Sequence, residues 1–167
     1  MGFNHGEFGG ALYWFSPDGS NRYMISSGNI VDVFNLNHEY FAIGGLDHGS
    51  YSRGEIIQIS QLADQEKWQG SPLIKLPSAP YAVSVFNSES AIITLSNGVV
   101  LYKDGKLSII IPDGPWEYFF PQNSVLSDDQ KKLYIGMRQY VAEIDLEQKA
   151  LRLLVPSEEF KQPIDHN

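Results

Sequence analysis

Short runs of apolar, β-branched and aromatic residues alternate with polar turns along nearly the whole chain, and the pattern is clearest between Pro121 and Pro156. Four apolar runs lie in that stretch: Asn123–Leu126, Lys132–Met137, Tyr140–Leu146 and Ala150–Val155. Runs of this kind joined by short polar turns predict an antiparallel meander. Four such strands are typical of one blade of a β-propeller. No segment of about a dozen residues shows a helical period.

The same unit recurs along the chain. Its third strand falls at Leu12–Phe15, Ile56–Ile59, Val100–Lys103 and Ala142–Asp145. A spacing of about 44 residues is typical of propeller blades. The sequence therefore predicts one all-β domain over residues 1–167, a partial β-propeller of about three and a half blades. The predicted units are an incomplete one at 11–26 and blades at 29–77, 79–111 and 116–156.

The first unit shows only its two outer strands, although Gly2–Gly10 could contribute one more. A closed propeller needs typically four to eight blades. Two interpretations follow: the chain is a fragment of a larger propeller, or it is an open arc that covers its free sheet edge with another chain. Because an unpaired edge invites pairing, we favour the open arc and expect a homo-oligomer formed through that edge.

Charge narrows the class of partner. Twelve basic residues stand against 20 acidic ones, a formal net charge of −8. This balance argues against nucleic-acid binding, which requires positive charge, and suits a basic protein partner. No apolar run approaches the roughly 18 residues of a membrane helix, so no membrane association is expected. No signal-peptide pattern opens the sequence, which favours a cytoplasmic location. The absence of cysteine excludes thiolate metal sites.

The densest polar segment is the predicted loop Leu46–Gly54, which contains Asp47, His48, Tyr51 and Arg53. Acid, imidazole and hydroxyl groups so close in sequence cannot form the through-space relay of a catalytic triad. Polar loops between strands are common binding sites. We therefore predict that this loop faces a protein partner and carries no catalytic residue.

Two further segments are candidates for the same role. Trp116 and Tyr118 lie in the most aromatic stretch of the chain and are interpreted either as core between blades or as anchors on a binding rim. Arg138 and Tyr140 lie at a predicted turn between strands. We predict that all four contact a partner.

One blade entry carries a resemblance. Asn123-Ser124-Val125-Leu126-Ser127-Asp128-Asp129, followed by Leu133-Tyr134-Ile135, resembles the repeated blade entry of the gluconolactonase and senescence-marker propellers. The resemblance implies a lactonase-type hydrolase that holds a divalent cation, Ca²⁺ or Zn²⁺, with Asn123. Asp32 is the other residue of this chain that would serve as a ligand.

More broadly, the glycine-rich segments Gly6–Gly10 and Gly45–Gly54, with Ile135–Arg138, are similar to a group of uncharacterised bacterial propeller-like proteins. This resemblance implies fold and bacterial origin, and no cofactor. Together with the acidic charge and small size, it leads to a hypothesis of a non-enzymatic binding module, an immunity or antitoxin-like protein that neutralises a basic toxin domain. The alternatives are a metal-dependent lactonase and a truncated, inactive propeller fragment.

Overall fold

The computed structural model describes residues 1–62, 66–116 and 119–155, and it confirms an all-β fold. Four antiparallel sheets follow one another along the chain. Sheet 1 contains β1 (Gly2–Asn4), β2 (Gly10–Phe15) and β3 (Arg22–Ser27); sheet 2 contains β4 (Ile30–Leu36), β5 (Glu39–His48), β6 (Tyr51–Gln61) and β7 (Trp68–Leu76). Sheet 3 contains β8 (Pro80–Asn87), β9 (Ser90–Leu95), β10 (Gly98–Lys103) and β11 (Lys106–Ile111); sheet 4 contains β12 (Asn123–Leu126), β13 (Lys132–Gly136), β14 (Val141–Asp145) and β15 (Ala150–Leu154).

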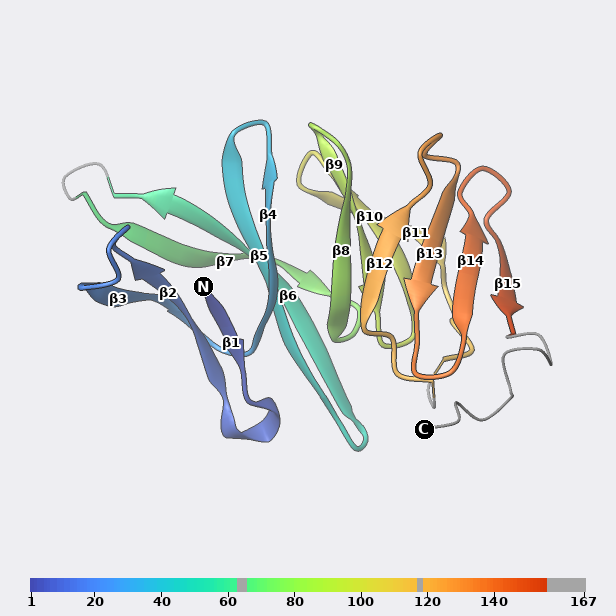
Figure 1. Ribbon diagram of the computed structural model, residues 1–167, viewed down its shortest axis with the longest axis horizontal. Helices are drawn as coiled ribbons and strands as arrows, with labels where there is room; N and C mark the ends of the chain where they lie inside the picture. Colours follow the sequence, from blue (N-terminus) through green and yellow to red (C-terminus); the bar gives the residue numbers. More distant parts are fainter. Residues whose placement is uncertain (63–65, 117–118, 156–167) are drawn as a thin grey trace, which may run out of the picture.

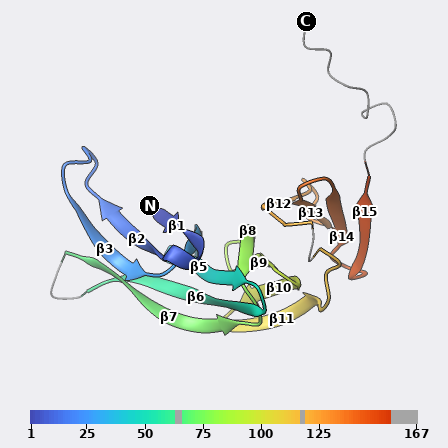
Figure 2. The ribbon, with the colours of Figure 1, turned by 90° about the horizontal axis from the view of Figure 1, so that it is seen from below.

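The sheets stand side by side like the blades of a partial propeller (Figure 1). In sheets 2, 3 and 4 the strands pair in chain order, and the first strands β4, β8 and β12 lie next to one another. Figure 2 shows the result as an open arc, with sheet 1 at one end and sheet 4 at the other. No helix among the described residues is long and apolar enough to cross a membrane.

Sheet 1 has one strand more than the two outer strands predicted. β1 pairs with β2, with Gly2 opposite Leu12, and it also lies beside β4 of sheet 2. The segment Gly2–Gly10 therefore does contribute a strand, followed by the single 3-10 turn η1 (Gly6–Phe8). The end sheet still has three strands where the other sheets have four.

Turn chemistry fixes the hairpins. Asp104 and Gly105 have φ values of 49° and 70°, as the left-handed turn of an aspartate-glycine hairpin requires. Gly19, in the predicted turn after β2, has a φ of 73°. Ser16 and Asp18 close that turn, since the Asp18 carboxylate accepts hydrogen bonds from the Ser16 hydroxyl and the Ser20 amide.

The prediction of a loop over Leu46–Gly54 is wrong. β5 and β6 continue pairing out to His48 opposite Tyr51, so this segment is a long hairpin with Gly49 and Ser50 at its tip. Glycines at positions 44, 45 and 54 hide the strand pattern in the sequence. They are accommodated in the ladder because other parts of the chain pass close to the backbone there.

The core lies between successive sheets, in three apolar clusters. One joins sheets 1 and 2, one joins sheets 2 and 3, and one joins sheets 3 and 4. In β9, Ile93 faces sheet 2 while its neighbour Ile92 faces sheet 4, and every residue of the strand is buried. The inner sheets are thus covered on both faces, which explains their unbroken apolar runs. Within residues 1–62, 66–116 and 119–155, each end sheet joins an apolar cluster on one face only.

Candidate functional site

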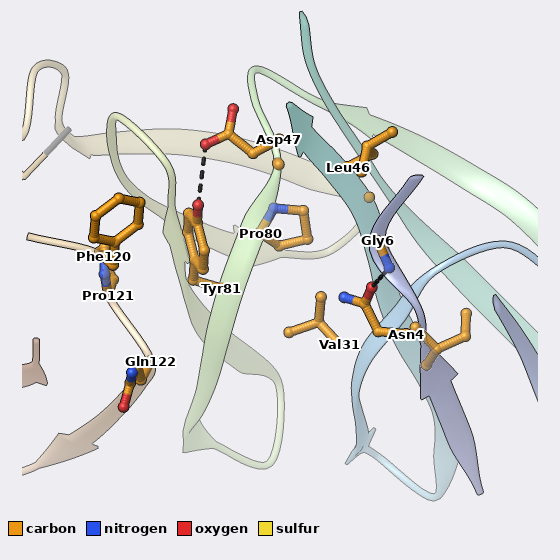
Figure 3. Close-up of a pocket in the computed structure, with 13 residues that line it drawn as sticks. Asn4, Gly6, Val31, Leu46, Asp47, Pro80, Tyr81, Phe120, Pro121 and Gln122 are labelled. Atoms are coloured by element: carbon orange, nitrogen blue, oxygen red, sulfur yellow. Dashed lines mark hydrogen bonds between the residues drawn. The ribbon is translucent and has the colours of Figure 1, made fainter. Parts of the chain in front are cut away.

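A pocket of about 510 Å³ opens on the side of the arc from which the β5–β6 hairpin projects. All four sheets or their entry segments line it (Figure 3). The lining side chains used below are Asn4, Val31, Asp47, Tyr81, Phe120 and Gln122. The pocket is therefore made by the assembled arc and belongs to no single sheet.

Asp47 and Tyr81 form the central polar pair of this pocket (Figure 3). The Tyr81 hydroxyl donates a hydrogen bond of 3.0 Å to the Asp47 carboxylate. Burial, and then the hydrogen bond and charge of Asp47, raise the pKa of Tyr81 to about 12. The phenol is accordingly protonated at neutral pH and holds the carboxylate in place. Asp47 is also the charged side chain among the described residues that line the pocket.

Close backbone contacts place Asp47 over β8. A Cβ on Gly45 would lie 2.7 Å from Pro80 Cδ, and one on Gly54 would lie 2.6 Å from the same atom. Only glycine lets the hairpin approach the start of β8 so closely. The Ser52 hydroxyl fastens this contact, because it accepts a 2.9 Å hydrogen bond from the Ala79 amide and lies 3.0 Å from the Ser96 hydroxyl.

The other predicted residues of the hairpin lie on its projecting tip. His48 Nε2 is 3.3 Å from a Glu7 carboxylate oxygen, and both side chains are exposed. The Arg53 guanidinium lies over the Tyr51 ring at 5.3 Å from its centroid. Tyr51 remains 51% exposed. The hairpin thus presents an aromatic ring and charged groups to solvent. Tyr51 and Arg53 alternate with Ser52, the partner of Asp47, so they lie on the face of the hairpin opposite to Asp47.

Arg138 and Tyr140 reach the same region from the β13–β14 connection. The Arg138 guanidinium lies 5.9 Å from the centroid of Phe120, a lining residue of the pocket. Tyr140 packs edge-on against Phe119, with ring centroids 4.8 Å apart. Phe120 has a φ of 49° and is 48% exposed. Phe120 therefore connects the two groups of predicted residues.

Trp116 does not face a partner. Its side chain is completely buried in the cluster between sheets 3 and 4, and its indole Nε1 donates a 3.0 Å hydrogen bond to the Leu95 carbonyl. The sequence interpretation of Trp116 as core between blades is the one the structure supports. Tyr118, predicted beside it, lies outside the described residues.

The alternative metal ligands serve local roles. The Asp32 carboxylate accepts a hydrogen bond of 2.8 Å from the Val33 amide in β4. The Asn123 side chain lies against Gly136 in sheet 4. Asp32 belongs to sheet 2, and sheet 3 stands between sheets 2 and 4. Within residues 1–62, 66–116 and 119–155 there is no group of three or more histidine, cysteine, aspartate or glutamate side chains that could hold a metal ion. The described geometry gives the lactonase hypothesis no ligand cluster.

Sequence inspection missed three pocket residues: Asn4, Tyr81 and Phe120. Tyr81 looks like an ordinary strand residue in the sequence, and Phe120 merges into an aromatic run. Their proximity to Asp47 depends on how three sheets pack. The signal available in the sequence was the pair Gly45 and Gly54, which marks a place where another segment comes close.

No protein-family model matches this chain, and no curated protein matches it. Solved structures do resemble it. PorZ, an essential bacterial surface component of the type-IX secretion system of Porphyromonas gingivalis, gives a TM-score of 0.56 at 9% identity, over 93% of this chain and 26% of PorZ. A candidate 6-phosphogluconolactonase of Bacteroides uniformis gives 0.51 at 9% identity, over 90% of this chain and 51% of the other.

The chain thus spans about a quarter and about half of the lengths of these two structures. At 9% identity the similarity shows a propeller-like fold alone. It supports neither of the two families that the sequence motifs resemble.

Proposed function

We propose that this protein is a binding module that holds a basic segment of a partner protein in the pocket that contains Asp47 and Tyr81. The observation that carries the proposal is the Asp47 carboxylate, which Tyr81 fixes at a pocket of about 510 Å³ that the half-exposed ring of Phe120 also lines. The role is one of recognition, without a chemical step.

Exposed aromatic rings at and near the pocket support a protein ligand. Phe120 lines the pocket and is 48% exposed. Phe8, in the η1 turn, is 85% exposed, and Tyr51, at the tip of the β5–β6 hairpin, is 51% exposed, although neither lines the pocket. Exposed aromatic side chains supply most of the energy of many interfaces, because they bury a large area and lose little conformational entropy. They support a protein or peptide ligand.

Charge supports a basic ligand. Asp47 is the acidic group at the pocket, and the protein as a whole carries a net charge of −8. The rings of Tyr81 and Phe120 offer faces to a guanidinium or ammonium group. The Arg138 guanidinium already lies over Phe120, so a ligand cation would approach Asp47 from the Tyr81 side of the pocket.

In its most specific form, the proposal is that the partner is a toxin domain which this protein neutralises by covering a basic surface. Small size and strong acidity support this form. An acidic inhibitor of a basic enzyme associates quickly at low salt, because opposite charges steer the encounter. The association rate with such a partner is expected to fall steeply as salt is added.

Selection from a random peptide display library tests the binding role without knowledge of the partner. We expect the wild-type protein to enrich peptides that carry arginine or lysine beside an apolar residue. The Asp47→Asn variant should bind those peptides at least about tenfold more weakly, the change that corresponds to 1.4 kcal/mol. The matched control Asp128→Asn removes an equal charge from an exposed turn between β12 and β13. This turn lies on the side of the arc opposite to the tip of the β5–β6 hairpin (Figure 1). Enrichment of neutral or acidic peptides, or equal loss in both variants, would contradict the proposal.

A further inference from the structure

Sheets 1 and 4, at the two ends of the arc, differ in the outward faces that their described residues form. In sheet 1, Leu12, Ile25 and Tyr23 face sheet 2, where Leu12 and Ile25 join the apolar cluster and the Tyr23 hydroxyl accepts a hydrogen bond from the Trp68 amide. Trp14 stacks on Tyr23 on the same side. Strand alternation turns Tyr13, Phe15, Met24 and Arg22 to the outward side. That outward side carries the aromatic face, which consists of Phe3, Tyr13, Phe15 and Met24.

The aromatic face is preorganised. Phe3 and Tyr13 pack edge to face with centroids 5.9 Å apart, and Tyr13 lies 6.3 Å from Phe15. Met24, opposite Tyr13 in the ladder, is 55% exposed. None of these four side chains belongs to the described cluster between sheets 1 and 2. The described residues therefore build a surface of three aromatic rings and a methionine at one end, over which Arg22 also lies, with its guanidinium 5.7 Å from the centroid of Tyr13.

The outward side of sheet 4 is charged. Leu133, Ile135 and Ile144 face sheet 3, and the alternate residues form the ion-pair face, a ladder row of Val125, Tyr134, Glu143 and Arg152 with Lys132 beside it. Glu143 lies 2.8 Å from the Arg152 guanidinium and 3.0 Å from the Lys132 ammonium. Its side chain is only 9% exposed, whereas that of Arg152 is 64% exposed. The acid is thus already neutralised, and the cations lie at the surface.

The two faces complement each other. Cations stack favourably on aromatic rings, and tyrosine and arginine are enriched at the centres of interfaces. Covering the ion-pair face with the aromatic face would leave Glu143 with both of its cations, and Asp145 on the same face would keep the hydrogen bonds that its carboxylate accepts from the Glu147 and Gln148 amides. The inner sheets are likewise covered on both sides by a neighbouring sheet, through apolar clusters.

We propose that two copies of this chain join head to tail, with the aromatic face of each copy covering the ion-pair face of the other, and close into one ring of eight sheets. The solved structure from Bacteroides uniformis fits a two-copy assembly at the level of fold, because this chain superposes on 51% of its length and two copies therefore match that length. Eight sheets fall within the range of closed propellers. A two-fold axis makes both contacts equivalent and stops further growth.

The first test is the solution mass, measured by size-exclusion chromatography with light scattering over a range of concentrations. Wild-type protein should give twice the chain mass of 18.8 kDa. Phe15→Glu, on the aromatic face, and Val125→Glu, on the ion-pair face, should each give monomers. Ile109→Glu places the same charge on β11, an exposed position on neither end face, and should remain a dimer. Circular dichroism would check that all three variants are folded.

Mixing the variants distinguishes head-to-tail pairing from every other dimer. When Phe15→Glu and Val125→Glu proteins are combined, one of the two contacts contains both substitutions and the other contains two unaltered faces. The mixture should therefore form dimers where each variant alone does not. A wild-type monomer at all concentrations, a dimer that survives either substitution, or a mass that grows without limit would each overturn the ring.

A second measurement holds even where a glutamate variant fails to fold. The chain has no cysteine, so Tyr13→Cys and Tyr134→Cys introduce single thiols on the two faces. Oxidation of the mixed proteins should yield a disulfide-linked heterodimer at least tenfold more abundant than either linked homodimer. Equal yields of all three species would contradict the head-to-tail contact.

Discussion

Trp116 gives the sharpest test of how the sheets pack. The indole is completely buried between sheets 3 and 4, and its Nε1 donates a hydrogen bond to the Leu95 carbonyl. Replacing a buried tryptophan by alanine costs about 3–5 kcal/mol, because apolar contacts are lost and a cavity remains. We therefore expect Trp116→Ala to lower the free energy of unfolding by about that amount. This is a large part of the stability of an ordinary domain.

Trp116→Phe separates the hydrogen bond from the burial. The phenyl ring keeps most of the apolar contact but cannot donate to Leu95, so a loss of about 1–3 kcal/mol is expected. Urea unfolding followed by far-ultraviolet circular dichroism measures both variants, because the backbone signal does not depend on the tryptophan removed. Tyr51→Ala, at a half-exposed aromatic position, serves as control and should change stability by less than about 0.5 kcal/mol. A Trp116→Ala protein as stable as the Tyr51→Ala protein would refute the packing argument.

Two further predictions concern the hairpin and the ion-pair face. Gly54→Ala should lower stability by about 1–3 kcal/mol through overpacking, since its Cβ would lie 2.6 Å from both Pro80 Cδ and the Ser78 carbonyl oxygen. Thermal unfolding measures this loss. The same substitution should displace Asp47 and so weaken peptide binding, which the peptide assay measures. The Arg152 and Lys132 hydrogen bonds lower the pKa of Glu143 from 4.5 to about 2. A carboxyl group with a lowered pKa stabilises the fold above its ordinary pKa, and that contribution is lost as the pH falls from 4.5 towards 2. The measurement compares the monomeric Phe15→Glu protein with the double variant that also carries Glu143→Gln. The difference in their melting temperatures should shrink as the pH falls over this interval. A difference independent of pH would contradict the ion-pair assignment.

Much of the fold could be predicted from sequence, because the local physics of strands and turns is strong in this chain. The run Ala91–Leu95 is apolar at every position except Thr94, which is the pattern of a strand covered on both faces, and β9 is such a strand. The Asp104-Gly105 hairpin and the turn at Gly19 follow from residues that tolerate positive φ. These features depend on few neighbours in sequence.

The long β5–β6 hairpin escaped prediction because its glycines serve contacts with a distant segment. Gly45 and Gly54 weaken a strand by the usual rules, yet they are needed where Pro80 comes within 2.7 Å or less of a Cβ at those positions. Nothing near them in sequence shows that approach. The same long-range packing brings Tyr81 to Asp47 and so creates the pocket.

The candidate residues on Asp47–Arg53 and at Arg138 and Tyr140 were chosen because polar and aromatic groups on connections are usually free to bind. Their role in binding stays a prediction, and Asp47, His48, Tyr51 and Arg53 lie on the paired strands β5 and β6. Trp116 was ambiguous for the opposite reason: a large aromatic residue on a connection can turn inward as readily as outward. The burial of its indole depends on Leu95 and on the third apolar cluster, both set by the packing of sheet 4 on sheet 3.

The measurement that tests the binding site most directly is an NMR titration of the labelled protein with acetyl-arginine amide and with acetyl-citrulline amide, a neutral molecule of almost the same shape. The account predicts that the arginine compound shifts the amide signals of Asp47, Tyr81 and Gln122, that citrulline leaves them unchanged, and that Asp47→Asn removes the response while Asp128→Asn keeps it. Equal shifts with both compounds, or an unaltered response in Asp47→Asn, would show that the pocket does not recognise a cation and would contradict the proposed function.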